Sequence, residues 1–345
     1  MPDSSRTVEF ECGEHGVGAL RTGPDDEPQL VAEVEHGGIR RKNGAREPAD
    51  AFRLGVVDEV LQQAAARQAN SFPFRRMSYL LAVMRGDTPT MHKMLEASIG
   101  QGQTNAAHGW QAHTAAFGGS VHNAHEQFRR GIQMASQNGF GEVAAQLGVE
   151  DAEVHALVGQ CDPAVDEVNA ALAISRDNYT LERASRTLAL CGQDGDASFL
   201  LRELNARFPR ATITQRMLIP LTEAVILFER GDPTRTLEAL EPLKAFDRSA
   251  RVEFWNEYVR GLAYLQIKDG RSAAEQFRSI LGHRGEFPNS PIYSLSQLGL
   301  ARALAAAGDV NAARQAYLDF LRLWNDADRD LEVLKSARQE YERLT

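Results

Sequence analysis

The segment LAAAGDVNAARQAYLDFL, residues 304–321, contains a spacing of side chains that recurs along most of the chain. Counted from the small residue at position 301, an apolar residue stands at +3, glycine at +7, alanine at +12 and aromatic residues at +16 and +19. In this unit the six positions are Ala301, Leu304, Gly308, Ala313, Tyr317 and Phe320. The same offsets give an upstream unit of Gly261, Tyr264, Lys268, Ala273, Phe277 and Ile280. Five further units begin at Ala224, Ser185, Ala152, Ala112 and Tyr79, and successive units start 33 to 40 residues apart.

Each offset has a physical reason in a pair of antiparallel helices. Residues at +0 and +3 share one face of a first helix. The +7 residue, glycine in six of the seven units, ends that helix in a left-handed cap. An aspartate often follows, as at Asp232 and Asp309, where it can cap a second helix. Alanine at +12 allows the two helices to cross closely, and the +16 residue is apolar in all seven units. A single hairpin cannot bury its apolar face, so the pattern predicts an all-α solenoid of about seven stacked hairpins.

The C-terminal end of the array has a predicted cap. The segment Asp330–Leu344 is amphipathic, with apolar residues on one side and charged residues on the other. A helix of this kind covers the last hairpin and presents a polar surface. We therefore assign residues 79–323 to the repeats and residues 324–345 to a C-terminal capping helix.

The N-terminal end has no visible cap. Residues 51–78 read as a half repeat, in which Asp58–Asn70 is a second helix closed by Phe72-Pro73. Residues 1–50 hold 7 of the 28 glycines and one of the 25 aromatic residues. They predict a poorly ordered leader, because so few apolar groups cannot offset the loss of chain entropy. Two short pieces of the leader, Thr7–Cys12 and Gln29–Glu35, alternate apolar and polar residues and are candidate strands.

The repeat resembles the tetratricopeptide repeat, whose motif has small and aromatic or apolar residues at these offsets. Gly261, Tyr264, Ala273 and Phe277 match that motif best. The chain departs from it in the missing tryptophan of the first helix, in most unit lengths, which exceed about 34 residues, and in Lys268 at the turn. The resemblance covers roughly residues 55 to 345. It implies a right-handed superhelix that binds a peptide or protein domain on its concave face.

The last third, from Tyr258 to Leu344, is also similar to the C-terminal repeat region of bacterial eukaryotic-like serine/threonine kinases and of some transcriptional regulators. This resemblance implies a sensor or scaffold in a bacterial signalling system. The chain has no lysine in a V-A-I-K motif, no H-R-D loop and no D-F-G, and the glycine cluster Gly13–Gly18 has the wrong spacing for a phosphate loop. We therefore expect a non-catalytic scaffold. The alternative is a detached C-terminal fragment of a kinase whose catalytic domain is absent from this chain.

The composition narrows the class of partner. With 38 basic and 47 acidic residues the net charge is −9, whereas a non-specific nucleic-acid binder needs a positive field. No stretch approaches the roughly 18 apolar residues that span a bilayer, and the start MPDSSRTVEF does not have the pattern of a secretory signal. The sequence predicts a cytoplasmic protein with a protein or peptide partner, and no nucleic acid, membrane insertion or small-molecule substrate.

Histidine and cysteine give no predicted metal site, cofactor or disulfide framework. Four histidines lie close together in the sequence: His108, His113, His122 and His125. The last two are three residues apart, a spacing that can chelate a metal, but no cysteine or glutamate completes a set nearby, so we expect solvent-facing side chains. His155 occupies an inner-face position and is expected to be a satisfied core histidine. Cys161 and Cys191 are expected to pack as small hydrophobic residues.

Two features are candidates for binding. Tyr258, Arg260, Gln297 and Arg302 lie on consecutive first helices and could face a groove that holds carboxylates of a peptide, although a solvated face explains them equally well. The long Gly- and Pro-containing connection at 282–291 could contact a partner, or could set the spacing and angle of the last two hairpins.

Overall fold

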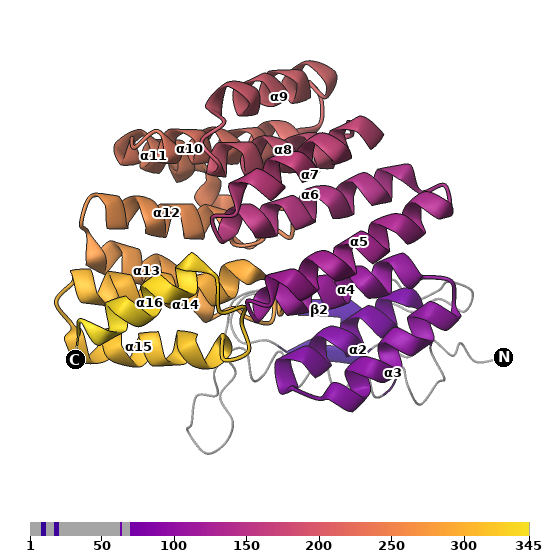
Figure 1. Ribbon diagram of the computed structural model, residues 1–345, viewed down its shortest axis with the longest axis horizontal. Helices are drawn as coiled ribbons and strands as arrows, with labels where there is room; N and C mark the ends of the chain where they lie inside the picture. The colour runs from indigo at the N-terminus through magenta and orange to yellow at the C-terminus, as the bar shows by residue number, and fades with distance from the viewer. Residues whose placement is uncertain (1–7, 12–16, 21–62, 64–69, 345) are drawn as a thin grey trace. The chain divides into compact units, whose positions relative to one another are not determined.

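The computed structural model describes residues 8–11, 17–20, 63 and 70–344 (Figure 1). The chain divides into two compact units, Met1–Gln68 and Ala69–Thr345. In the first, β1 (Val8–Glu11) and β2 (Val17–Leu20) pair antiparallel, with Val8 opposite Leu20. The first predicted strand therefore contains β1, whereas the predicted strand Gln29–Glu35 and most of the predicted helix Asp58–Asn70 lie outside the described residues.

The second unit is built from consecutive helical hairpins, seven of them in its described residues, followed by one more helix (Figure 1). The hairpins are α2 (Phe72–Arg85) with α3 (Thr88–Gly100), α4 (Thr104–Phe117) with α5 (Val121–Gln137), α6 (Gly141–Leu157) with α7 (Cys161–Ile174), α8 (Asn178–Leu190) with α9 (Asp194–Arg207), α10 (Ile219–Glu229) with α11 (Pro233–Leu240), α12 (Trp255–Gln266) with α13 (Gly270–Leu281), and α14 (Pro291–Ala306) with α15 (Val310–Leu323). A π-helical turn, η1 (Thr214–Leu218), leads into α10, and a 3-10 helix, η2 (Glu241–Phe246), follows α11. The final helix, α16 (Glu332–Glu342), begins two residues after the predicted start of the cap. The predicted all-α solenoid of stacked hairpins is confirmed.

The turn inside each hairpin has the left-handed backbone that the template predicts. All seven +7 residues have a positive φ: Gly86 (67°), Gly119 (75°), Gly159 (82°), Gly192 (68°), Gly231 (73°), Lys268 (62°) and Gly308 (83°). Lys268 therefore takes the same conformation as the glycines, at the steric cost that glycine avoids. The predicted aspartate caps also form, because Asp232 accepts a hydrogen bond from the Arg235 amide and Asp309 from the Ala312 amide.

The repeat positions form the core. The +0 and +16 residues of every unit are buried, and Phe277 is an example of how they pack. Its ring lies between two glycines of neighbouring first helices, where an added Cβ would come within 2.7 Å at Gly261 and 2.5 Å at Gly299. Ala273, Ala301, Leu304, Ala313 and Tyr317 are buried in the same cluster, and Tyr264 packs against it partly buried.

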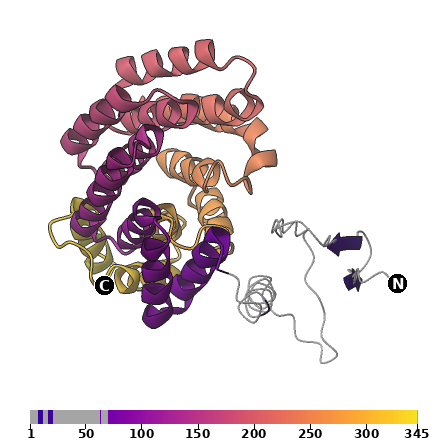
Figure 2. The same cartoon turned by 90° about the vertical axis from the view of Figure 1, so that its right-hand side faces the viewer.

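The array of hairpins closes on itself. In Figure 2 the yellow C-terminal helices lie against the purple helices of the N-terminal half, and α14 contacts α4. Trp324, only 1% exposed, donates a hydrogen bond from Nε1 to the carbonyl of Phe117 (3.1 Å), and Ser294 donates to the same carbonyl (2.6 Å). The Asp328 amide donates to the carbonyl of Gly119 (3.1 Å). We call this set of contacts the closure. It joins segments about two hundred residues apart, and the repeat template contains no signal for it.

Candidate functional site

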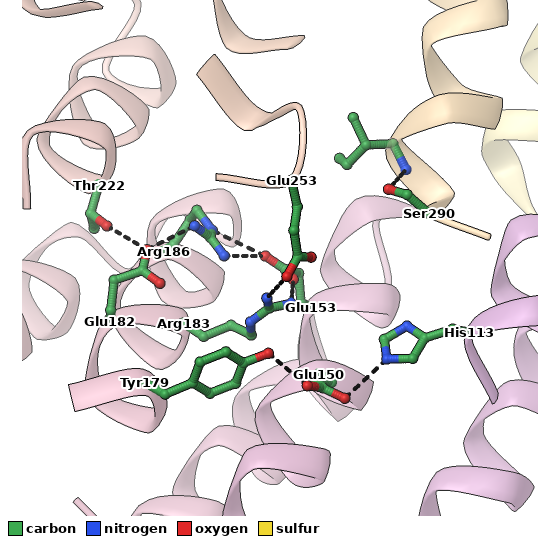
Figure 3. A network of polar contacts seen from close by, with 11 residues as sticks. His113, Glu150, Glu153, Tyr179, Glu182, Arg183, Arg186, Thr222, Glu253 and Ser290 are labelled. Carbon is green, nitrogen blue, oxygen red and sulfur yellow. Dashed lines mark hydrogen bonds and ion pairs between the residues drawn. The ribbon is translucent and has the colours of Figure 1, made fainter. Parts of the chain in front are cut away.

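The first helices of the hairpins form a continuous layer, which we call the inner face. Helices α6, α8, α10, α12 and α14 contact one another in sequence along this layer. A network of charged and polar side chains crosses it between α4 and α10, as Figure 3 shows. The second helices pack behind it, each against its own hairpin partner.

Two arginines of α8 form the centre of the network (Figure 3). Arg183 pairs with Glu153 of α6 and with Glu253 (3.0 Å), which lies in the loop before α12. Arg186 pairs with the same Glu153 (2.8 Å) and with Glu182 one turn away (2.7 Å). Both guanidinium groups are buried and stack on aromatic rings. Because each buried charge has a partner on another hairpin or turn, the network fixes neighbouring hairpins relative to one another.

A second branch of the network is formed by His113, Glu150 and Tyr179. Glu150 of α6 lies 3.0 Å from His113 Nε2 on α4 and accepts a hydrogen bond from the Tyr179 hydroxyl on α8 (2.6 Å). Burial acts to raise the pKa of Glu150, but the hydrogen bond and charge of His113 outweigh it and bring the pKa down to about 2. The same pairing outweighs the effect of burial on His113 and raises its pKa. The branch is an ion pair bridging three first helices.

The four residues proposed from the sequence to bind a partner do not form one surface. The guanidinium of Arg260 is buried and contacts Gln276 of α13 (2.9 Å) and Asp247. Gln297 donates to the Ala316 carbonyl of its own hairpin (3.3 Å). Tyr258 is 9% exposed, and burial raises its pKa to about 12. These three side chains therefore make contacts within the array.

Arg302 differs from the other three because its side chain is 36% exposed. Its fork binds both carboxylate oxygens of Glu340 on α16, with Nε–Oε2 and Nη2–Oε1 distances of 2.9 Å each. The Tyr317 hydroxyl donates to the same carboxylate (2.9 Å). Arg302 thus holds a carboxylate with bidentate geometry, but this carboxylate belongs to the capping helix, whereas the sequence suggested the carboxylate of a peptide.

His125 and His155 differ from the other histidines because both lie close to the same two carboxylates, Asp151 and Glu167. His122 is 67% exposed and pairs with Asp328 (3.0 Å), and it lies in the first turn of α5. His108 contacts Gln127 instead (2.8 Å). His125 and His155 meet Asp151 and Glu167, and these four are the described residues that could hold a metal ion. Burial, and next the charge of Asp151, raise the pKa of Glu167 to about 8. We expected no cysteine or glutamate near His125, but Glu167 of the next hairpin lies 3.0 Å from His125 Nδ1.

The expectation for the cysteines is also wrong. Cys161 and Cys191 form a disulfide, with their Cα atoms 5.3 Å apart. Cys161 is the first residue of α7 and Cys191 directly follows α8, so both lie at the inter-helix turns of consecutive hairpins. Stacking brings these turns together, which a search for short cysteine motifs does not detect.

The connection at 282–291 makes contacts within the array. Phe287 packs edge-on against Phe254 (centroids 4.8 Å apart). The Arg284 guanidinium lies 5.1 Å from the ring centre of Phe117, and Asn289 donates to Thr114 (3.3 Å). Because Phe117 and Thr114 belong to α4, this connection contacts the same helix as the closure, which neither sequence-based alternative anticipated.

Comparison with known proteins adds little. No protein-family model matches the chain, and no curated protein matches it. Among solved structures, the crystal structure of the P58(IPK) TPR domain covers 86% of this chain and 96% of its own, with 13% identity and a TM-score of 0.32. The description of the fold therefore rests on the hairpins themselves. None of the described helices is long and apolar enough to cross a membrane.

Proposed function

We propose that the chain is a non-catalytic scaffold that binds a protein or peptide partner on the C-terminal half of its inner face. The observation that carries this proposal is the bidentate contact of a partly exposed Arg302 with the Glu340 carboxylate. Arginine in this geometry selects planar carboxylates. An acidic side chain or a C-terminal carboxylate of a partner would compete with Glu340 for the guanidinium group of Arg302.

The exposure of Arg302 favours its end of the inner face over the stretch between α6 and α10. Between α6 and α10 the charges of Glu153, Glu182, Arg183 and Arg186 are buried and satisfy one another. Displacing them would leave buried charges unpaired, which is costly. Tyr258 and Gln297 lie on the same helix layer as Arg302 and remain our candidates for flanking contacts. Arg260 would join them only if its contact with Asp247 were exchanged for one with the partner.

The sequence resemblances give the proposal a finer form. In it the partner is a kinase or regulator of a bacterial signalling system, and the chain works in the cytoplasm beside a separate catalytic protein. The alternative, a detached kinase fragment, predicts H-R-D and D-F-G motifs in the adjacent upstream reading frame. The proposal includes no nucleic-acid or small-molecule ligand, as the acidic composition favours.

Affinity capture with the full chain as bait tests the proposal. We expect a specific protein partner that the wild-type chain retains and the variant Arg302→Ala loses. The matched control is Arg322→Ala, because Arg322 is 70% exposed and pairs with Asp319 on its own helix. Equal retention of every partner by both variants would exclude the Arg302 surface, and an empty capture with a folded bait would exclude the scaffold itself.

A further inference from the structure

Four potential metal ligands converge from three consecutive helices. His125 comes from α5, Asp151 and His155 come from α6, and Glu167 comes from α7. One nitrogen or oxygen atom of each lies within 4.8 Å of the others. Asp151 and His155 are four residues apart and therefore share one helix face. The arrangement crosses from one hairpin to the next, so it depends on the stacking of the array.

Several atoms of this group are buried without a hydrogen-bond partner among the residues that the structure describes. They are Asp151 Oδ1, His155 Nε2 and Glu167 Oε2. The side chain of Asp151 is 2% exposed and that of His155 is 9% exposed. His155 Nε2 lies 3.8 Å from Asp151 Oδ1 and 3.8 Å from Glu167 Oε1, too far for a hydrogen bond. Buried polar atoms of native proteins are normally satisfied, so the unpartnered His155 Nε2, with two carboxylates 3.8 Å away, indicates a ligand between these groups.

The imidazoles are oriented for coordination. His155 Nδ1 lies 2.7 Å from Gln160 Oε1, an acceptor, so Nδ1 carries the proton and the lone pair of Nε2 faces the carboxylates. Metal-binding histidines are commonly fixed by such a hydrogen bond from the other ring nitrogen. His125 Nδ1 lies 2.8 Å from Asp151 Oδ2 and 3.0 Å from Glu167 Oε1. A metal ion at this nitrogen would contact both carboxylates.

The charge of the group points to a divalent cation. Asp151 and Glu167 bring two carboxylates together, and the ion pairs described for them involve only the two histidines, not arginine or lysine. A buried carboxylate needs a counter-charge or a metal. Two neutral imidazoles and two carboxylates neutralise an ion of charge +2.

We propose that His125, Asp151, His155 and Glu167 bind one divalent transition-metal ion of the Zn²⁺ type. Two imidazole nitrogens favour such ions over Ca²⁺ and Mg²⁺, which prefer all-oxygen sites. Ligands of a tetrahedral site with bonds of about 2.0–2.1 Å are separated by about 3.4 Å. Binding would therefore draw the more distant ligand atoms together, from separations of up to 4.8 Å, and would move His125 Nδ1 slightly away from Asp151 Oδ2 and Glu167 Oε1, which now lie 2.8 and 3.0 Å from it.

Solvent reaches the group from one side. His125 is 42% exposed, and His155 lines an open surface hollow of about 560 Å³ together with His122 and residues 159–163. A metal ion can therefore enter without unfolding of the array. Once bound, it would link α5, α6 and α7, and it would stabilise the native chain because the unfolded chain lacks the preformed site.

Calorimetric titration of the untagged, chelator-treated full chain with Zn²⁺ tests the proposal. We expect one equivalent to bind with micromolar or tighter affinity, a rise in Tm, and visible d–d absorption when Co²⁺ replaces Zn²⁺. His155→Ala and His125→Ala should each weaken binding by about 100-fold or more, and Gln160→Leu by about 10- to 100-fold. His125 is partly exposed, so its variant should remain folded by circular dichroism.

The control is His122→Ala, the histidine three residues before His125 that lies outside the four-residue group. It should bind as wild type does. Absence of Zn²⁺ binding by the folded wild-type chain would overturn the proposal, as would binding that survives both His125→Ala and His155→Ala. Equal losses in His122→Ala and His155→Ala would assign the metal to surface histidines and would also overturn it.

Discussion

Replacing Gly119 with alanine should destabilise the chain more than the same change at another turn glycine. Gly119 has a φ of +75° and Gly231 a φ of +73°, so both substitutions place an L side chain in the left-handed region. At Gly231 a new Cβ would meet no atom within 4 Å. At Gly119 it would lie 2.6 Å from Trp324 Cδ2 and 2.7 Å from the Cβ of Ala327. The difference between the variants therefore reports on the closure.

The expected loss in the free energy of unfolding has three contributions. The left-handed conformation costs an alanine about 1–2 kcal/mol at either site. Overpacking against Trp324 adds about 1–3 kcal/mol at Gly119 only. The hydrogen bond from the Asp328 amide to the Gly119 carbonyl is worth about 1 kcal/mol more where the backbone shifts. Gly231→Ala should thus cost about 1–2 kcal/mol and Gly119→Ala about 3–6 kcal/mol, the sum of these contributions.

Urea unfolding of both variants measures the difference, and hydrogen exchange locates it. The Asp328 amide should exchange about 30-fold faster in Gly119→Ala for every 2 kcal/mol lost at the closure. In a Trp324→Leu background the penalty of Gly119→Ala should fall towards that of Gly231→Ala, because the contacting ring is gone. Equal free energies of unfolding for the two alanine variants, within about 0.5 kcal/mol, would show that the closure contact does not form in solution.

Three further perturbations test other parts of the structure. Reduction of the Cys161–Cys191 disulfide, which closes a loop of 30 residues, should lower the free energy of unfolding by about 3–4 kcal/mol if the disulfide acts through chain entropy. The Tm of Cys191→Ser should not depend on reductant. A wild-type Tm that is insensitive to reductant would contradict this prediction. Burial, and next the charge of Asp194, raise the pKa of Glu229 to about 7, so the folded chain retains a proton that the unfolded chain releases above pH 4.5. The free energy of unfolding should therefore fall as the pH rises from 4.5 to 7. We expect a loss of only about 1 kcal/mol, because the Glu229 side chain is partly exposed. In Glu229→Gln this contribution should be absent, so the difference in Tm between pH 5 and pH 8 should be smaller than in the wild-type chain. Glu340→Gln should lower the free energy of unfolding by about 1 kcal/mol, because it weakens the contacts of α16 with Arg302 and Tyr317. Glu332→Gln, which alters a surface pair with Lys335, should leave stability unchanged. Equal Tm values for the two variants would contradict the docking of α16 through Glu340.

The hairpins could be predicted because each is encoded locally. The spacing from Ala301 to Tyr317 requires only the helical period, a small residue at the crossing and a residue that tolerates the left-handed turn. Even Lys268, which replaces the turn glycine, adopts the left-handed conformation, with a φ of 62°. Stacking then repeats the same packing between hairpins along the array, so the structure of one well-matched unit predicts the structure of the others.

The metal-ligand group could not be predicted in this way because its members belong to different units. His125 invited comparison with His122, its neighbour on the same helix, whereas its partners are Asp151, His155 and Glu167 of the next hairpin. The stacking of a second helix on the first helix of the following unit, here α5 on α6, brings these positions together, and the offsets within one unit do not show it. The disulfide between Cys161 and Cys191 has the same origin, as both residues lie at adjacent inter-helix turns.

The closure changes how the array should respond to damage. In an open solenoid each hairpin contacts only its neighbours, so the terminal hairpins unfold first and independently. Here Trp324 and Ser294 share the carbonyl of Phe117, which places the last hairpin next to the second one. Loss of the contact at Trp324 should therefore increase exchange at the α4–α5 turn as well as in α16. An inner face whose curvature is fixed from both ends presents Arg302 to a partner at a constant angle, which reduces the entropy that binding must overcome.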